Sequence, residues 1–123
     1  MKVLKDPGQV LQIMDAKLDE LYERFDKANG EEAAEISGKD VAIIKIAGHI
    51  RHAIKRHGYF GVEDMACVYE YVDNDKKGDH EYRDTIDTWF MKGIAKGATW
   101  ALKEIEKRME EEPRQPLILL ELR

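Results

Sequence analysis

The sequence has few of the residues that build disulfide frameworks, turn-rich folds and membrane spans. Its one cysteine, Cys67, excludes a disulfide framework and a zinc site made of cysteines, and is typical of a reducing compartment. Nine glycines and three prolines among 123 residues favour a few long elements over many short strands. The longest apolar run, residues 65–69, is too short to cross a membrane. We therefore expect one cytoplasmic domain without a membrane segment.

Charged residues are plentiful, but the two signs are unevenly distributed. The chain has 20 basic and 25 acidic residues, and its net charge of −5 disfavours nucleic-acid binding over the whole surface. Between residues 40 and 63 there is no acidic side chain. The basic residues of this stretch, candidates for binding an anion or a nucleic acid, are Lys45, Arg51, Lys55 and Arg56. Such a helix face binds an anion, an RNA backbone or an acidic partner, or it lies in solvent paired with acidic helices around it.

The spacing of apolar residues predicts an all-α fold, an antiparallel bundle of about four helices. Asp6 and Pro7 indicate a helix start, because Asp is a favoured N-cap and Pro a favoured first residue. Behind them, a coiled-coil-like seam runs along a helix of about 22 residues that Gly30 ends. The seam consists of Leu11, Met14, Leu18, Leu21 and Phe25. Tyr22 widens the apolar stripe, so we expect this helix to pack against more than one neighbour.

The second helix is predicted over residues 37–57. Ser37 and Asp40 resemble a capping box, and Gly58 is well placed as the C-terminal cap. The β-branched run of residues 41–44 leaves a buried strand as the alternative. A short third helix is expected over residues 62–72, followed by a polar turn.

The longest element is predicted to be a helix from about His80 to Glu112, which Pro113 ends. Gly93 and Gly97 lie close to its inner stripe and predict a close helix crossing or a kink. Residues 1–112 then form the helical bundle, and residues 113–123 form an extended apolar arm. The aliphatic residues of the arm, which we predict to bind a partner, are Leu117, Ile118, Leu119, Leu120 and Leu122.

The end of the second predicted helix contains a motif with chemical meaning. Arg51 is followed after five residues by His57, and then by Gly58 and Tyr59. This pattern resembles the Arg-(four to six residues)-His motif of the HEPN ribonuclease superfamily, whose members are helical bundles that cleave RNA without metal. The resemblance implies that Arg51 stabilises phosphate charge, that His57 acts in acid–base catalysis and that Tyr59 supports the site. The alternative is a histidine that caps the end of the helix.

No metal site and no cofactor are predicted. His49 and His52 are three residues apart, but no carboxylate or cysteine lies near them in the sequence. Residues 73–84 are similar to a calcium-binding loop at some positions, but Lys77 stands where an oxygen ligand is required. Cys67 is interpreted as a small core residue.

These features together predict a non-enzymatic protein that binds other proteins. It is expected to act as a homo-oligomer or as a small subunit of a larger assembly, in the manner of phage or plasmid accessory proteins. The apolar arm, the seam of the first helix and the long last helix all indicate surface that another molecule covers. Two alternatives stay open: a HEPN-like ribonuclease using Arg51 and His57, and a regulator that binds nucleic acid through the basic helix 41–57.

Overall fold

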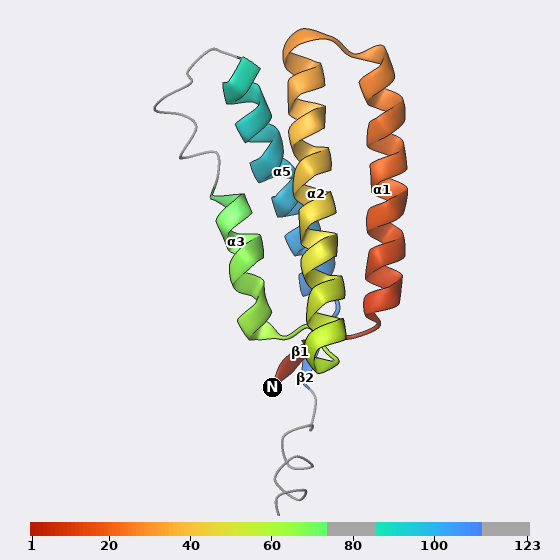
Figure 1. Cartoon of the computed structure of the whole chain (residues 1–123), viewed down its shortest axis with the longest axis vertical. Coiled ribbons are helices and arrows are strands. Elements are labelled where there is room, and N and C mark those ends of the chain that lie inside the picture. Colours follow the sequence, from red (N-terminus) through yellow and green to blue (C-terminus); the bar gives the residue numbers. More distant parts are fainter. Residues whose placement is uncertain (74–85, 112–123) are drawn as a thin grey trace, which may run out of the picture.

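Helices make up most of the chain, which the computed structural model describes over residues 1–73 and 86–111. In chain order the elements are β1 (Lys2–Leu4), α1 (Pro7–Lys27), α2 (Gly30–His57), the 3-10 helix η1 (Val62–Met65), α3 (Ala66–Val72), α5 (Ile86–Glu106) and β2 (Met109–Glu111). Figure 1 shows α2 in front, with α1 and α3 on either side and α5 behind. The mostly helical fold is as predicted, whereas the two-stranded sheet is not.

Helix α1 begins where the sequence predicts it. The Asp6 side chain accepts a hydrogen bond from the Gln9 amide at 3.2 Å, and Pro7 is the first helical residue. The helix ends at Lys27, and not at Gly30 as predicted. Gly30 is the first residue of α2, and its φ of 59° lies in the left-handed region that favours glycine.

Helix α2 is continuous and longer than predicted. Because it starts at Gly30, the predicted helix start at Ser37 is wrong, and so is the alternative strand over residues 41–44. Glu31 and Glu32 suit the positive end of the helix dipole, and Ile36 is buried in the core, so the first two turns form without a cap at residue 37. Gly58 ends the helix as predicted, with a φ of 87°.

The closest helix contact joins α2 and α5 at glycines. A Cβ atom on Gly38 would collide with the carbonyl oxygen of Phe90, and one on Gly93 would collide with the carbonyl oxygen of Glu35. A Cβ on Gly97 would come within 2.8 Å of the α2 backbone. The two backbones approach this closely because neither has a side chain at the crossing. The predicted close helix crossing at Gly93 and Gly97 is therefore confirmed.

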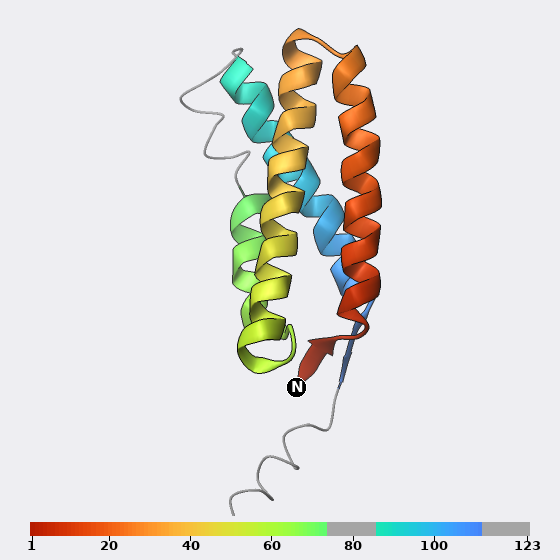
Figure 2. The same ribbon diagram turned by 45° about the vertical axis from the view of Figure 1, so that its right-hand side comes forward.

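Helices α2 and α5 run in the same direction (Figures 1 and 2). The register shows this too, since Glu35 lies next to Gly93 and Lys39 lies next to Gly97. Consecutive helices alternate in direction, so the second and the last described helices end up parallel. This pair has the most extensive contact in the fold, so the closest contact joins two parallel helices although consecutive described helices alternate in direction.

The predicted C-terminal helix is wrong at its end, because α5 stops at Glu106 and not at Glu112. Residues 109–111 form β2 instead, antiparallel to β1, with Met109 opposite Leu4. Arg108 holds the turn between α5 and β2 in place. Its carbonyl accepts a hydrogen bond from the Lys5 amide at 2.8 Å, and its guanidinium donates one to the Glu104 carboxylate at 3.2 Å. The strand forms because a partner from the other end of the chain lies beside it, which local sequence does not reveal. Residues 80–85 at the start of the predicted helix, and residues 112–123, are outside the described residues. Among the described helices, α2 is the longest.

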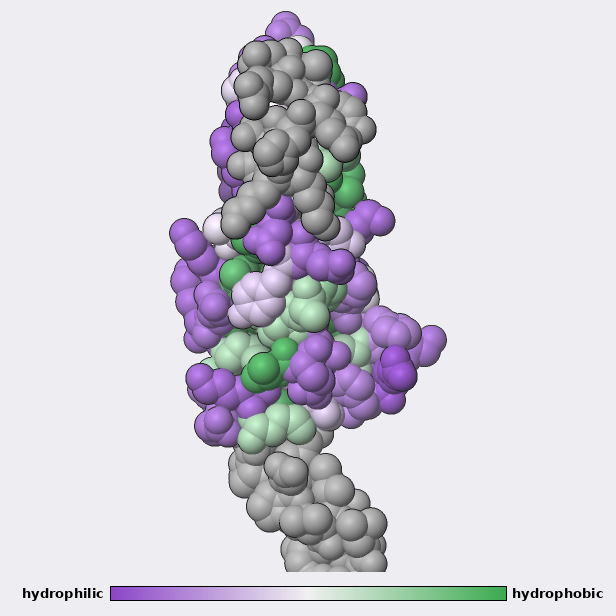
Figure 3. Space-filling view, turned by 90° about the vertical axis from the view of Figure 1, so that its left-hand side faces the viewer, coloured by the Kyte–Doolittle hydropathy of each residue, from purple (hydrophilic) through white to green (hydrophobic). Residues whose placement is uncertain are grey.

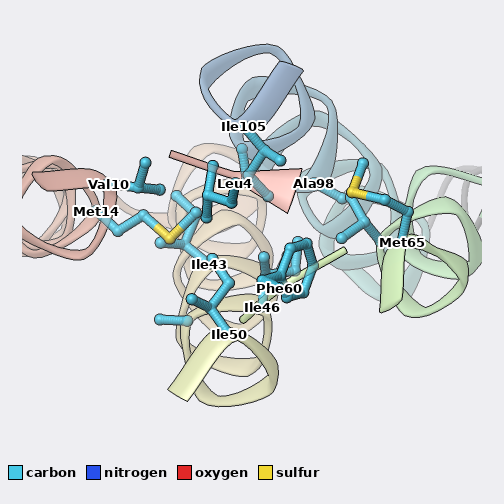
Figure 4. Packing of buried hydrophobic residues seen from close by; sticks show 14 of the residues in the cluster. Leu4, Val10, Met14, Ile43, Ile46, Ile50, Phe60, Met65, Ala98 and Ile105 are labelled. Atoms are coloured by element: carbon cyan, nitrogen blue, oxygen red, sulfur yellow. The ribbon is translucent and has the colours of Figure 1, made fainter. Parts of the chain in front are cut away.

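The hydrophobic core surrounds α2. Figure 4 shows side chains from β1, α1, α5 and the η1 region meeting those of α2. Phe60 is fully buried, and its carbonyl accepts a hydrogen bond from the Leu4 amide at 2.7 Å. The loop after α2 is thus held against the sheet. None of the described helices combines the length and the apolar character that a membrane span requires.

Candidate functional site

The predicted basic residues lie on the second half of α2 and are exposed. Arg51 contacts Asp15 of α1, with Nη2 and Oδ1 3.8 Å apart, and both side chains are more than half exposed. Among residues 1–73 and 86–111, Lys45, Lys55 and Arg56 have no ion-pair partner. Within these ranges, the interpretation of a basic face paired with neighbouring acidic helices holds for Arg51 alone, and the other three side chains are exposed.

A histidine-rich pocket of about 230 Å³ lies between the end of α2 and the segment η1–α3. It is lined by His49, His52, Ala53, Arg56, His57, Glu63, Asp64, Ala66 and Cys67. His57 Nε2 lies 3.4 Å from Asp64 Oδ1, a long hydrogen bond in which the ring donates to the carboxylate. The other oxygen of Asp64 accepts from the Gly61 amide at 2.8 Å. Asp64 therefore positions both the loop and the imidazole.

Tyr59 stands beside His57. The two ring centroids are 4.2 Å apart, and the Tyr59 hydroxyl donates to Glu63 Oε1 at 3.1 Å. Arg51 is not part of this group, because it does not line the pocket and its guanidinium turns to Asp15 on α1. Six residues of helix separate it from His57, a rotation of about 120° around the axis. Within one chain the structure thus brings together His57 and Tyr59, but not Arg51.

Cys67 borders the same pocket and is half-buried. Its Sγ donates a hydrogen bond to the carbonyl oxygen of Asp64 at 3.3 Å. Burial raises the pKa of the Cys67 thiol, and the nearby Asp64 and Glu70 carboxylates raise it further. The thiol is therefore protonated at neutral pH and suits a packing role better than a nucleophilic one. Over the part of the chain that the structure describes, no group of three or more His, Cys, Asp or Glu side chains could hold a metal ion.

A second candidate site lies on the opposite side of α2, along α1. Only Val10, Met14 and Leu21 of α1 are buried, whereas Tyr22 is 68% exposed and Phe25 is 44% exposed. These two aromatic residues border a hollow of about 210 Å³ whose other walls include Ser37 and Asp40 of α2. Burial raises the pKa of the Asp40 carboxyl, which lies against this apolar surface. Within the described residues, the predicted seam is therefore buried at Met14 and Leu21, half-buried at Leu11 and Leu18, and exposed at Phe25.

Ile44 extends this apolar surface along α2 and is 51% exposed. It lies seven residues from Ser37 and seven from Arg51, so the three share one face of the helix. The Asp15–Arg51 pair and the hollow between Tyr22 and Ser37 show that this face borders α1. We call it the α1–α2 face; it comprises Asp15, Leu18, Tyr22, Phe25, Ser37, Asp40, Ile44, Gly48 and Arg51.

Ile44 and Asp64 were not predicted from the sequence as site residues. Ile44 could have been found, because it stands opposite the buried stripe of α2 that contains Ile43, Ile46 and Ile50. Asp64 carries no such signal, because its contact with His57 depends on the turn at Gly58 and the loop that follows. The predicted arm residues Leu117, Ile118, Leu119, Leu120 and Leu122 lie outside the described residues.

The side of the molecule that carries α3 has a different character. Pale and green residues lie there among hydrophilic ones (Figure 3). Its exposed apolar residues include Val62 of η1, at 54%, and Tyr69 of α3, at 49%.

Comparison of the chain with protein-family models, with curated proteins and with solved structures gave no match.

Proposed function

We propose that the protein is a non-enzymatic interaction protein that acts as a homo-oligomer or as a small subunit of a larger assembly. The observation that carries this proposal is the half-covered α1, with Tyr22 and Phe25 exposed beside a hollow that α2 completes. Burial of an exposed aromatic side chain against a partner removes apolar surface from water and so favours binding. Such residues often anchor protein–protein interfaces.

The apolar arm is a second proposed contact, on sequence grounds. It consists of residues 113–123, shortly after β2, and its five large aliphatic residues favour contact with another protein over solvent. The two contacts are separable, because a chain that ends at Glu112 retains the whole α1–α2 face.

Light scattering on the size-exclusion peak tests the proposal. We expect the full chain to have a mass above that of one chain. Tyr22→Glu should lower this mass, because a carboxylate that is costly to bury replaces the ring. Tyr69→Glu is the matched control, since Tyr69 is an exposed tyrosine on α3 and should leave the mass unchanged. A mass of one chain at every concentration would exclude the homo-oligomer. If Tyr22→Glu still assembles and the chain that ends at Glu112 does not, the arm is responsible for assembly.

A second candidate, metal-independent RNA cleavage, is favoured by the pocket at the end of α2. There His57 contacts Asp64, while His52 and Arg56 line the same hollow. An imidazole beside a carboxylate is suited to acid–base catalysis, and a guanidinium is suited to phosphate. Nucleic-acid binding through helix 41–57 would use the same surface, with Lys45, Lys55 and Arg56 as phosphate contacts.

An RNA assay separates these functions. Cleavage that disappears in His57→Ala and falls in Asp64→Asn would support catalysis at this pocket. Binding without cleavage, with an affinity that falls as salt rises, would support nucleic-acid binding alone. If RNA is neither bound nor cleaved by the folded wild-type chain, both forms of the second candidate are excluded.

A further inference from the structure

We infer that the α1–α2 face is completed by a second copy of this chain, packed in the opposite direction. This inference rests on the proposed function and names the partner and its orientation. Ile44 lies at the centre of the face, because the Asp15–Arg51 pair lies at one end and the hollow between Tyr22 and Ser37 at the other. In the sequence, Ile44 is midway between Ser37 and Arg51, and Leu18 is near the middle between Asp15 and Tyr22.

The distribution of charge favours the opposite direction over the same direction. Residues 19–35, at the end where α1 leads into α2, contain seven acidic and two basic residues. Residues 41–57, which reach the other end of α2, contain four basic residues and no acidic one. Figure 1 shows these two segments at opposite ends of the α1–α2 pair. Two copies in opposite directions bring the acidic end of one to the basic end of the other, whereas parallel copies would repel.

The charges at both ends are available for a partner. Within the described ranges, Asp19 and Asp26 form no ion pair, nor does Lys55. Asp19 and Asp26 lie three and four residues from Tyr22, on neighbouring turns of the same side of α1. Lys55 lies one helical turn beyond Arg51 on α2. The exposed apolar centre is thus flanked by one set of charges of each sign.

The size of the face suits a second copy at moderate affinity. Two adjacent helices about 30 Å long offer a surface about 20 Å wide, and a symmetric pair would bury on the order of 1,200 Å² in total. This value lies at the lower end of the range for specific interfaces. At Gly48, one turn beyond Ile44, an added Cβ would meet nothing within 4 Å, so the backbone there is open to close approach.

Analytical ultracentrifugation over a range of concentrations and salt tests the inference. We expect a monomer–dimer equilibrium that weakens as salt rises, because opposite charges meet at both ends. Ile44→Asp should abolish dimerisation, whereas Val62→Asp, at an aliphatic residue of similar exposure on η1, should not change it. Circular dichroism melting of each variant shows that the fold is kept.

Charge reversal tests the orientation. Reversing the acidic end with Asp19→Lys and Asp26→Lys, or the basic end with Lys55→Glu, should weaken the dimer by about tenfold. All three changes together should restore it, because each reversed end then meets an oppositely charged end of the second copy. Parallel copies, or a face that binds a foreign protein, predict no such restoration.

The outcomes separate this inference from the proposed function. If the wild-type chain assembles but Ile44→Asp does not affect assembly, and removal of the arm does, the inference is overturned and the proposed function stands. If the wild-type chain is monomeric at all concentrations, both the inference and the homo-oligomer fail. A dimer that strengthens as salt rises would overturn the opposite orientation.

Discussion

The two long contacts of α2 are built in opposite ways. Against α5, glycine backbones approach so closely that no side chain fits between them. Against α1, three buried residues make the contact, and Tyr22 and Phe25 on the same helix remain exposed. The first contact is complete within one chain, whereas the second leaves apolar surface beside it. The α1 side therefore carries the exposed apolar surface on which the proposed contact with a partner rests.

The same comparison explains where tolerance to substitution is expected. A contact between backbones has no room for an added atom, since well-packed interiors cannot expand locally. Where a contact covers only part of a helix, substitutions of the side chains that stay exposed change the free energy of unfolding little. Four substitutions in α1, α2 and α5 test these two contacts and the turn that ends α5, from the largest expected effect to the smallest.

Gly38→Ala should have the largest effect. The added methyl group would collide with the α5 backbone at Phe90, so the two helices must separate, at a cost of about 3 kcal/mol or more. Gly48→Ala, in the same helix, is the control and should stabilise the fold by about 0.5–1 kcal/mol, because its Cβ meets open space. Urea denaturation measures both, and equal effects of the two would contradict the close crossing.

Leu21→Ala should destabilise the fold by about 2–5 kcal/mol, because this side chain is fully buried between α1 and α2. Tyr22→Ala, at the next residue, should change the free energy of unfolding by about 0.5 kcal/mol or less, because the ring is 68% exposed. The comparison is made by denaturation at low protein concentration, where the chain is monomeric. A large loss in Tyr22→Ala would mean that the ring is covered within one chain.

Glu104→Gln tests the turn that ends α5. The hydrogen bond from Lys107, together with that from Arg108, lowers the pKa of Glu104 below its usual value. Its ionised form therefore stabilises the fold above the usual carboxyl pKa, and this stability is lost as pH falls through the lower folded-state pKa. We expect a cost of about 1 kcal/mol at pH 7 that disappears in acid. Thermal melting as a function of pH measures it, and a cost independent of pH would contradict the charged contact.

Asp40→Asn should have the smallest effect and the opposite sign. Burial raises the pKa of Asp40, so its ionisation opposes folding as pH rises through the usual carboxyl range to the raised value. The variant should be more stable than the wild type at pH 7, by about 0.5 kcal/mol or less, and equal to it in acid. Melting curves at both pH values decide this, and a loss at pH 7 would mean that the carboxylate has a stabilising partner.

Local signals predicted much of the helical structure. Asp6 and Pro7 gave the start of α1, Gly58 the end of α2, and Gly93 and Gly97 the close crossing. Each of these depends on a backbone property of one residue type. The start of α2 was missed because a cap-like pattern at Ser37 lies inside a helix that burial of Ile36 and contact with α1 support.

The candidate sites were predictable in part. The basic residues of α2 and the pair His57 and Tyr59 were identified from the sequence, and the structure places the latter two in contact. The separation of Arg51 from His57 follows from helix geometry, but its partner Asp15 is on another helix and only the packing reveals it. Ile44 became a candidate only when the structure showed which faces of α2 are covered.

The sequence by itself determined the helical class, the start of α1, the end of α2 and the position of the tight crossing, because these depend on neighbouring residues and on glycine. Only the tertiary structure decided that residues 109–111 form a strand, that α2 and α5 run in parallel and that α1 is half covered. Each of these depends on residues distant in the chain that become neighbours only when all helices pack around α2.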